Sequence, residues 1–224
     1  MNICSYIDHT FLKPTALYAD IQKLCTEAIN YSFAAVCVPP PMVTYARDLV
    51  KSSHVKVATV IGFPFGYSVK QAKSAETQQA IVDQADELDV VINLIALENG
   101  QWDYLESEMS EIVCVAHDQG KIVKAIIETG LLSEEQIIRC CHIYAGCGVD
   151  FLKTSTGYAQ KSATVDAVRL MRRNLPASIL VKASGGIKTY DFAKELVDAG
   201  ASRLGCSASV AIAAGEQRIE ASGY

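Results

Sequence analysis

Two lysines end two short apolar runs, and each run then breaks into glycine, serine and threonine. They are Lys153, in Val149-Asp-Phe-Leu-Lys-Thr-Ser-Thr-Gly157, and Lys182, in Ile179-Leu-Val-Lys-Ala-Ser-Gly-Gly186. Burying a lysine is costly because its charged form loses hydration. Desolvation and a second cation nearby both lower the pKa of a lysine, which leaves a nucleophilic lone pair at neutral pH. Two lysines placed alike in two strand–loop units therefore predict chemistry through a Schiff base.

Two further strand-like runs carry a charged residue where a buried strand should be apolar. Barrel strands are covered on both faces, yet Asp89 interrupts Leu88–Asn93 and Lys124 interrupts Val123–Glu128. Side chains alternate between the two faces of a strand, and the apolar neighbours of each charged residue suit the outer face. We therefore expect Asp89, Lys124 and both lysines above to point into one interior. Taken singly, each lysine could instead extend into solvent, Asp89 could be a structural ion-pair partner, and Glu128 could face water.

Strand-like and helix-like runs alternate from one end of the chain to the other. The predicted strands are Cys4–Asp8, Ala34–Val38, Val57–Ile61, Leu88–Asn93, Val123–Glu128, Asp150–Thr154, Ile179–Ala183 and Arg203–Cys206. The predicted helices are Ala16–Tyr31, Met42–Val50, Ser68–Gln84, Trp102–His117, Gln136–Tyr144 after a capping box at Ser133, Thr164–Asn174 and Tyr190–Ala199, with a short Ala-rich helix after the last strand.

This count and size predict a compact (β/α)8 barrel of the TIM type, an α/β fold. A doubly wound open sheet is the alternative, but it has a glycine-rich turn after its first strand, and no GxGxxG follows any early strand here. No linker or change of composition divides the chain. We expect one domain over residues 1–224, with a C-terminal tail over 215–224 that could move.

Composition excludes several classes of protein. The 224 residues carry a net charge of −5 and no basic run, so nucleic acid is not an expected partner. We find neither a signal peptide nor an apolar segment of membrane-spanning length. The eight cysteines are scattered, and most, including Cys25, Cys37, Cys114 and Cys140, lie in apolar patterns. Reduced, buried thiols in a cytoplasmic protein are the expectation. No metal-ligand spacing occurs, so we predict no metal and no cofactor.

The last two predicted strands end in glycine and serine, as in Ser184-Gly-Gly-Ile-Lys188 and Leu204-Gly-Cys-Ser207. Many barrels hold a phosphate between the loops after strands seven and eight. Gly185 and Gly186 would let the backbone approach an anion, although tight turns alone would also explain them. The loop after Lys153 could add further donors from Thr154, Ser155, Thr156 and Gly157.

With these residues in view, the chain resembles the deoxyribose-phosphate aldolase family. The resemblance runs almost end to end, and the pair of strings Lys-Thr-Ser-Thr-Gly and Lys-Ala-Ser-Gly-Gly is its most specific part. The matching segments are Ile7-Asp-His-Thr10, Val36-Cys-Val-Pro39, Val60-Ile-Gly-Phe-Pro64, Ala85-Asp-Glu-Leu-Asp-Val-Val-Ile-Asn93, Lys124-Ala-Ile-Ile-Glu-Thr129, Phe151-Leu-Lys-Thr-Ser-Thr-Gly157 and Val181-Lys-Ala-Ser-Gly-Gly186.

The resemblance implies a class I aldolase on a (β/α)8 barrel that needs no cofactor. It implies that Lys153 forms the Schiff base and that Lys182 and Asp89 donate and accept protons. The substrates would be phosphorylated deoxy sugars and acetaldehyde, and relatives are commonly homodimers or higher homo-oligomers. The same resemblance implies that Asp8, Thr10, Cys37 and Lys124 line the pocket and that Gly185, Gly186, Gly205 and Ser207 contact the phosphate.

Two tyrosines affect which residues we expect at the active site. Tyr158 stands where some relatives carry a lysine after the Lys-Thr-Ser-Thr-Gly string, and Tyr224 ends the chain. In some members a final tyrosine reaches the active site, so Tyr224 is a candidate proton relay, although a frayed end is the simpler interpretation. Two other functions stay open: a different class I aldolase or transaldolase, and a barrel that only binds a sugar phosphate.

Overall fold

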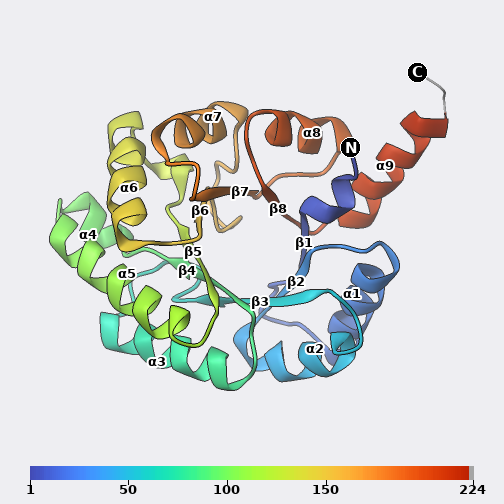
Figure 1. The fold of residues 1–224 in the computed structure, drawn as a ribbon, viewed down its shortest axis with the longest axis horizontal. Helices are drawn as coiled ribbons and strands as arrows, with labels where there is room; N and C mark the ends of the chain where they lie inside the picture. The colour runs from blue at the N-terminus through green and yellow to red at the C-terminus, as the bar shows by residue number, and fades with distance from the viewer. Residues whose placement is uncertain (222–224) are drawn as a thin grey trace.

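The computed structural model describes the backbone of residues 1–221 and the side chains of residues 1–216. Parallel strands close into a barrel in the order β1 to β8. Figure 1 shows the strands in the centre with the helices arranged around them. The predicted (β/α)8 barrel is therefore confirmed. The strands are β1 Ile7–Thr10, β2 Ala35–Val38, β3 Lys56–Ile61, β4 Glu87–Val91, β5 Ile122–Ile126, β6 Phe151–Lys153, β7 Leu180–Ser184 and β8 Arg203–Cys206.

The helices α4, α6, α7 and α8 begin at a polar side chain that caps them. Ser133 and Gln136 form the predicted capping box, in which Ser133 Oγ accepts from the Gln136 N–H at 3.2 Å. Thr164 and Thr189 cap the next two helices with their hydroxyls, which accept from the Ala167 and Phe192 N–H groups. The helices are α1 Tyr18–Asn30, α2 Val43–Val50, α3 Lys70–Val82, α4 Leu94–Glu98, α5 Trp102–His117, α6 Glu134–Cys147, α7 Val165–Asn174, α8 Tyr190–Asp198 and α9 Ser209–Ala221, with 3-10 turns η1 Ile3–Tyr6, η2 Pro40–Met42 and η3 Thr129–Leu131.

Three predicted boundaries were wrong, each because a local turn ends or delays a strand. Ile3–Tyr6 is the turn η1, whose start is capped by the Asn2 side chain, so β1 begins only at Ile7. Asn93 does not belong to β4, since its side chain accepts from the Ala96 N–H at 3.1 Å and starts α4. Glu128 has a left-handed backbone (φ 56°) that ends the extended run after β5. The helix α4 was not predicted.

The barrel interior has an apolar side and a charged side. On β2 and β3, Cys37, Ala58 and Val60 form a small apolar cluster inside the ring. Residues next to them in sequence, such as Val36 and Val57, belong to the large core between strands and helices. Alternation along each strand thus separates the outer core from the interior. The charged residues described below fill the remaining part of the interior.

A buried ion pair outside the barrel holds the end of β4. Lys73 of α3 donates to Glu108 of α5 at 2.8 Å and to the Val91 carbonyl, also at 2.8 Å. Both side chains are almost completely shielded from solvent. Because Val91 is the last residue of β4, this pair fixes the strand two residues beyond Asp89.

The first and last described segments lie side by side, as Figure 1 shows for η1 and α9. The Ile3 N–H donates to the Glu216 carboxylate at 3.1 Å. Residues 215–221, expected to begin a tail, continue α9, and residues 222–224 lie outside the described chain. Among the described residues, no helix combines the length and apolar character needed to cross a bilayer.

All eight cysteines are free thiols, as expected. Most are buried, but Cys114 on α5 is exposed, so the expectation of burial was wrong there. The apolar run around Cys114 belongs to an amphipathic helix, and this residue lies on its solvent side.

Candidate active site

The alternation of side chains along the strands brings distant charged residues together inside the barrel. Three carboxylates and four cations contribute, and all but Arg203 are buried, Arg203 being partly exposed. They come from β1, β4, β5, β6, β7 and β8, and they are Asp8, Glu87, Asp89, Lys124, Lys153, Lys182 and Arg203.

Asp89 is the centre of this cluster. Its Oδ2 accepts from Lys153 Nζ and from Lys182 Nζ, each at 2.7 Å, and its Oδ1 accepts from Lys124 Nζ at 2.9 Å. The four interior residues predicted from alternation therefore meet at one carboxylate. A charged carboxylate in this position is stabilised by three nearby cations, and the pKa of Asp89 lies well below its ordinary value although burial alone would raise it.

Asp8 of β1 and Glu87 of β4 complete the network. Asp8 accepts from Lys182 at 2.5 Å, from Lys124 at 3.2 Å and from Arg203 at 2.6 Å. Glu87 lies 2.5 Å from Lys124 Nζ and 3.2 Å from Arg203. Arg203 thus ties β8 to both β1 and β4 across the barrel.

The electrostatics of the cluster distinguish Lys153 from its neighbours. Burial lowers the pKa of Lys153, and the cation of Lys182 lowers it further, while Asp89 opposes the change. For Lys124 and Lys182 burial acts in the same downward direction, but the carboxylates of Asp8 and Asp89 outweigh it and raise both pKa values. If Lys153 is neutral and the others are charged, three cations balance three carboxylates. The cluster can therefore hold a neutral amine beside an ammonium group and a carboxylate.

Cys37 lies inside the ring on β2, but it is not among the residues that line the cavity described below, although the resemblance implied that it lines the pocket. It packs with Ala58 and Val60 and is fully buried. Burial and the nearby charge of Asp89 raise the pKa of the thiol to about 11. Cys37 is therefore a neutral, apolar wall at neutral pH.

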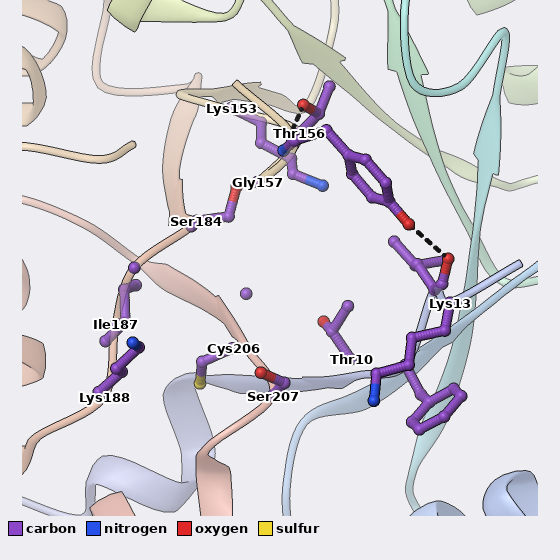
Figure 2. Close-up of a pocket in the computed structure, with 16 residues that line it drawn as sticks. Thr10, Lys13, Lys153, Thr156, Gly157, Ser184, Ile187, Lys188, Cys206 and Ser207 are labelled. Atoms are coloured by element: carbon purple, nitrogen blue, oxygen red, sulfur yellow. Dashed lines mark hydrogen bonds between the residues drawn. The ribbon is translucent and has the colours of Figure 1, made fainter. Parts of the chain in front are cut away.

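A cavity of about 250 Å³ opens above Lys153 at the carboxyl ends of the strands. Figure 2 shows Lys153 entering it from one side and Thr10, Cys206 and Ser207 lining the other. The predicted residues that line it are Thr10, Lys153, Thr156, Gly157, Gly185, Gly186, Gly205 and Ser207. Asp8, Asp89, Lys124 and Lys182 lie beneath it in the charged cluster.

The loop after β7 reaches the cavity through backbone that only glycine adopts easily. Gly185 and Gly186 have φ angles of 88° and 75°. A Cβ on Gly185 would come within 3.0 Å of Ser162 Oγ and 3.3 Å of Gly157 Cα. These glycines let two loops meet at the cavity rim, where backbone N–H groups can face an anion.

Glu128 was left open by the sequence, and it is buried against the loop after β6. Its Oε2 accepts from the Thr156 N–H at 3.1 Å and from the Thr156 hydroxyl at 2.5 Å. Both donors of Thr156 are therefore directed at Glu128. In this arrangement Thr156 shapes the loop beside Gly157 and does not direct a donor into the cavity.

Sequence reasoning missed Glu87, Arg203, Lys13 and Lys188. The first two obey the same alternation as the residues that were found, since Glu87 precedes Asp89 by two positions and Arg203 precedes Gly205 by two. Lys13 and Lys188 lie on loops that line the cavity, where no periodicity indicates orientation.

A second cavity, of about 410 Å³, adjoins the first and has mostly apolar walls. Val60, Phe63 and Pro64 line it, and Leu12 and Tyr158 line both cavities. Tyr158 therefore stands between a polar cavity and an apolar one. The other tyrosine of interest, Tyr224, lies outside the described residues, and its role stays a prediction.

Within the described part of the chain, no three His, Cys, Asp or Glu side chains form a cluster that could hold a metal ion. The interior carboxylates instead form ion pairs with lysine and arginine side chains.

A closed barrel with charged side chains converging below a cavity at the carboxyl ends of its strands is the arrangement of a barrel enzyme. The model of the DeoC/LacD family aldolase matches residues 3–214, and the chain belongs to this family of aldolases.

Related proteins agree with this assignment over nearly the whole chain. The deoxyribose-phosphate aldolase of Thermococcus gammatolerans is 49% identical over 222 residues, covering 98% of this chain and 99% of the relative. That of Caldicellulosiruptor saccharolyticus is 50% identical over 211 residues, covering 94% and 96%. The tetrameric deoxyribose phosphate aldolase structure from Aeropyrum pernix superposes with a TM-score of 0.90 at 32% identity, covering 97% of this chain and 92% of that one.

Proposed function

We propose that this aldolase cleaves 2-deoxy-D-ribose 5-phosphate reversibly into D-glyceraldehyde 3-phosphate and acetaldehyde through a Schiff base on Lys153. The observation that carries the proposal is the pair of lysines on one carboxylate oxygen, each 2.7 Å from Asp89 Oδ2. A nucleophilic amine must be neutral, and burial beside Lys182 lowers the pKa of Lys153. The two relatives that are named deoxyribose-phosphate aldolase add support.

The first half of the reaction uses Lys153 as nucleophile. Its Nζ lone pair adds to the C1 carbonyl of the open-chain sugar, loss of water leaves an imine, and uptake of a proton makes this an iminium. A base takes the proton of the C3 hydroxyl, the C2–C3 bond breaks, and its electrons move into the iminium to form an enamine. Glyceraldehyde 3-phosphate then leaves. The iminium is the electron sink, so the proposed reaction needs no cofactor.

The second half returns the enzyme to its starting state. Protonation of the enamine carbon and hydrolysis of the resulting imine release acetaldehyde and the free amine. Asp89, held as a carboxylate, can accept protons, and Lys182, held as an ammonium group, can donate them. Positioned acid–base groups contribute about 10²–10⁴-fold to such steps.

The remaining residues either bind the substrate or support the catalytic groups in this proposal. Gly185, Gly186, Gly205 and Ser207 surround the cavity end that would hold the phosphate. Asp8 and Lys124 support Lys182 and Asp89 from below. Thr10 lines the side of the cavity that faces Lys153, and Tyr224 is a candidate relay for the enamine proton.

We also propose that the enzyme works in the cytoplasm as a homo-oligomer in the breakdown of deoxyribose phosphates. The tetrameric relative from Aeropyrum pernix supports assembly.

Reduction with borohydride tests the proposal directly. The protein treated with acetaldehyde and borohydride should carry an ethyl group on the peptide that contains Lys153, as detected by mass spectrometry. Lys153→Leu should lose both this label and turnover, whereas Lys51→Leu, which changes an exposed lysine after α2, should keep both. Labelling of another lysine in the Leu variant would contradict the assignment.

The choice of donor separates this proposal from its rivals. Acetaldehyde should be trapped and dihydroxyacetone phosphate should not, while a different class I aldolase or a transaldolase would show the opposite preference. A barrel that only binds a sugar phosphate would trap neither.

A further inference from the structure

Tyr158 connects two loops that follow strands not paired with each other in the barrel, β6 and β1. Its hydroxyl donates to the Leu12 carbonyl at 2.9 Å, which joins the loop after β6 to the loop after β1. Its N–H donates to Thr156 Oγ1 at 3.1 Å, and its ring meets the Phe63 ring edge to face at 5.4 Å. Tyr158 is half exposed, yet its backbone, ring and hydroxyl each have a partner.

The residue after Leu12 is Lys13, an exposed cation at the cavity rim. Figure 2 shows Lys13 on one side of the cavity and Lys188 on the other, with Ser207 between them. Neither lysine has a carboxylate within ion-pair distance among the described residues. Lys13 Nζ instead lies 5.7 Å from the centroid of the Phe11 ring. Both cations are therefore available to a ligand.

The cavity wall itself carries no acidic side chain among the described residues that form it. The acids of the site lie below, where Lys124, Lys182 and Arg203 already neutralise them. An unpaired cation above an acid-free wall of glycine and serine attracts an anion. A phosphate monoester fits this chemistry, because it accepts hydrogen bonds from backbone N–H groups and from an ammonium group together.

The Leu12 contact matters because the loop that carries Lys13 has little regular structure. Residues 11–17 connect β1 to α1 without helix or strand. The Phe11 N–H donates to the Cys37 carbonyl at 3.0 Å, and the Ala16 N–H donates to the Lys13 carbonyl at 3.1 Å. The Tyr158 hydroxyl adds an attachment at the residue directly before Lys13. Without it, the ammonium group would have to be ordered at the moment of binding.

We propose that Lys13 is a specificity-determining residue that binds the substrate phosphate and that Tyr158 is the positioning residue that holds it there. The inference rests on the proposed function, since it names the group that would select phosphorylated over unphosphorylated sugars at the same site.

The test compares two substrates that differ only in the phosphate, 2-deoxyribose 5-phosphate and 2-deoxyribose. Lys13→Met should lower the ratio of their kcat/KM values about tenfold, because a charged hydrogen bond is lost but water and salt screen this exposed site. Tyr158→Phe keeps the ring on Phe63 and removes only the hydroxyl, so it should lower the ratio by a smaller factor. In the Lys13→Met background the Tyr158→Phe change should have no further effect on the ratio.

Lys51→Met is the matched control, since it removes an exposed lysine distant in sequence from every cavity residue and should leave the ratio unchanged. Binding of inorganic phosphate, measured by calorimetry, should weaken in Lys13→Met and not in Lys51→Met, and this readout does not depend on turnover.

The outcomes distinguish the two proposals. Equal losses with both sugars in Lys13→Met, together with unchanged phosphate binding, would overturn the role of Lys13 and leave the proposed function intact. An additive Tyr158→Phe effect in the double variant would overturn the positioning role. A wild-type protein that binds phosphate through Lys13 but neither cleaves the sugar nor traps acetaldehyde would contradict the proposed function instead.

Discussion

Lys153 and Lys182 are neighbours across β6 and β7, and their Nζ atoms share one acceptor, Asp89 Oδ2, at 2.7 Å each. The sheet register alone brings the two residues together, because position 153 pairs directly with position 182. One carboxylate oxygen therefore connects the group proposed as nucleophile with the group proposed as proton donor. This geometry allows a proton to pass between the amines without leaving the buried cluster.

Removing the cation of Lys182 should make the nucleophile harder to deprotonate. Lys182 lowers the pKa of Lys153, so Lys182→Met should raise that pKa and reduce the neutral fraction at pH 7. The acid limb of the pH profile for borohydride trapping of acetaldehyde should then move to higher pH. Trapping is the better measurement, because turnover would also report the loss of Lys182 as proton donor. An acid limb that stays in place or moves to lower pH would contradict the role of Lys182.

The charge count predicts opposite effects on stability for two members of the same cluster. Lys153→Met leaves three cations facing three carboxylates and removes an amine whose charged form burial disfavours, so the free energy of unfolding should be unchanged or higher. Asp89→Asn keeps the shape but removes the charge that three lysines contact. It should cost about 3–5 kcal/mol, as breaking a buried ion pair does.

Urea denaturation at pH 7 measures both variants. A strongly destabilised Lys153→Met protein would mean that Lys153 is charged and needed for balance, which would contradict a neutral nucleophile in the resting enzyme.

Protonation of the interior carboxylates should destabilise the barrel in acid. The folded-state pKa values of Asp8 and Asp89 lie below their ordinary value of 3.8, so the folded state binds fewer protons than the unfolded state around that pH. The stability that they contribute is fully present above about pH 4 and is lost as the pH falls through the folded-state values. The free energy of unfolding should therefore fall with pH below about 4 in wild type. The fall should be shallower in Asp8→Asn, and an equal slope in the two proteins would contradict this account.

The alternation of side chains was enough to predict Asp89, Lys124, Lys153 and Lys182, because a buried strand places every second residue on the same face. It could not show which residues meet across the ring. The contact of Arg203 with Glu87 joins residues 116 positions apart, and only closure of β8 onto β1 creates it.

The wrongly predicted strand boundaries have a local cause that the spacing of apolar residues does not reveal. Asn2 and Asn93 use their side chains to start turns, and each lies next to an apolar run that continues the strand pattern. Lys13 was missed for a related reason. Its place at the cavity depends on the hydrogen bond between Tyr158 and Leu12, which joins two irregular loops.

The last prediction concerns Gly205, which faces the barrel interior two residues after Arg203. A Cβ there would lie 2.9 Å from Ser184 Cβ and 3.1 Å from Lys182 Cε, so Gly205→Ala must displace the side chain that donates to Asp8 and Asp89. A displacement of this kind costs up to about 10²-fold in rate, and we expect kcat to fall by about 10–100-fold while the fold persists. Gly146→Ala is the matched control, because it adds the same methyl group to helix α6 where the new Cβ would meet no atom outside the local helix backbone within 4 Å. That variant should keep wild-type kcat and gain up to about 1 kcal/mol of stability from the better helix former. Equal kcat values for Gly205→Ala and Gly146→Ala would show that the position of Lys182 does not limit the reaction.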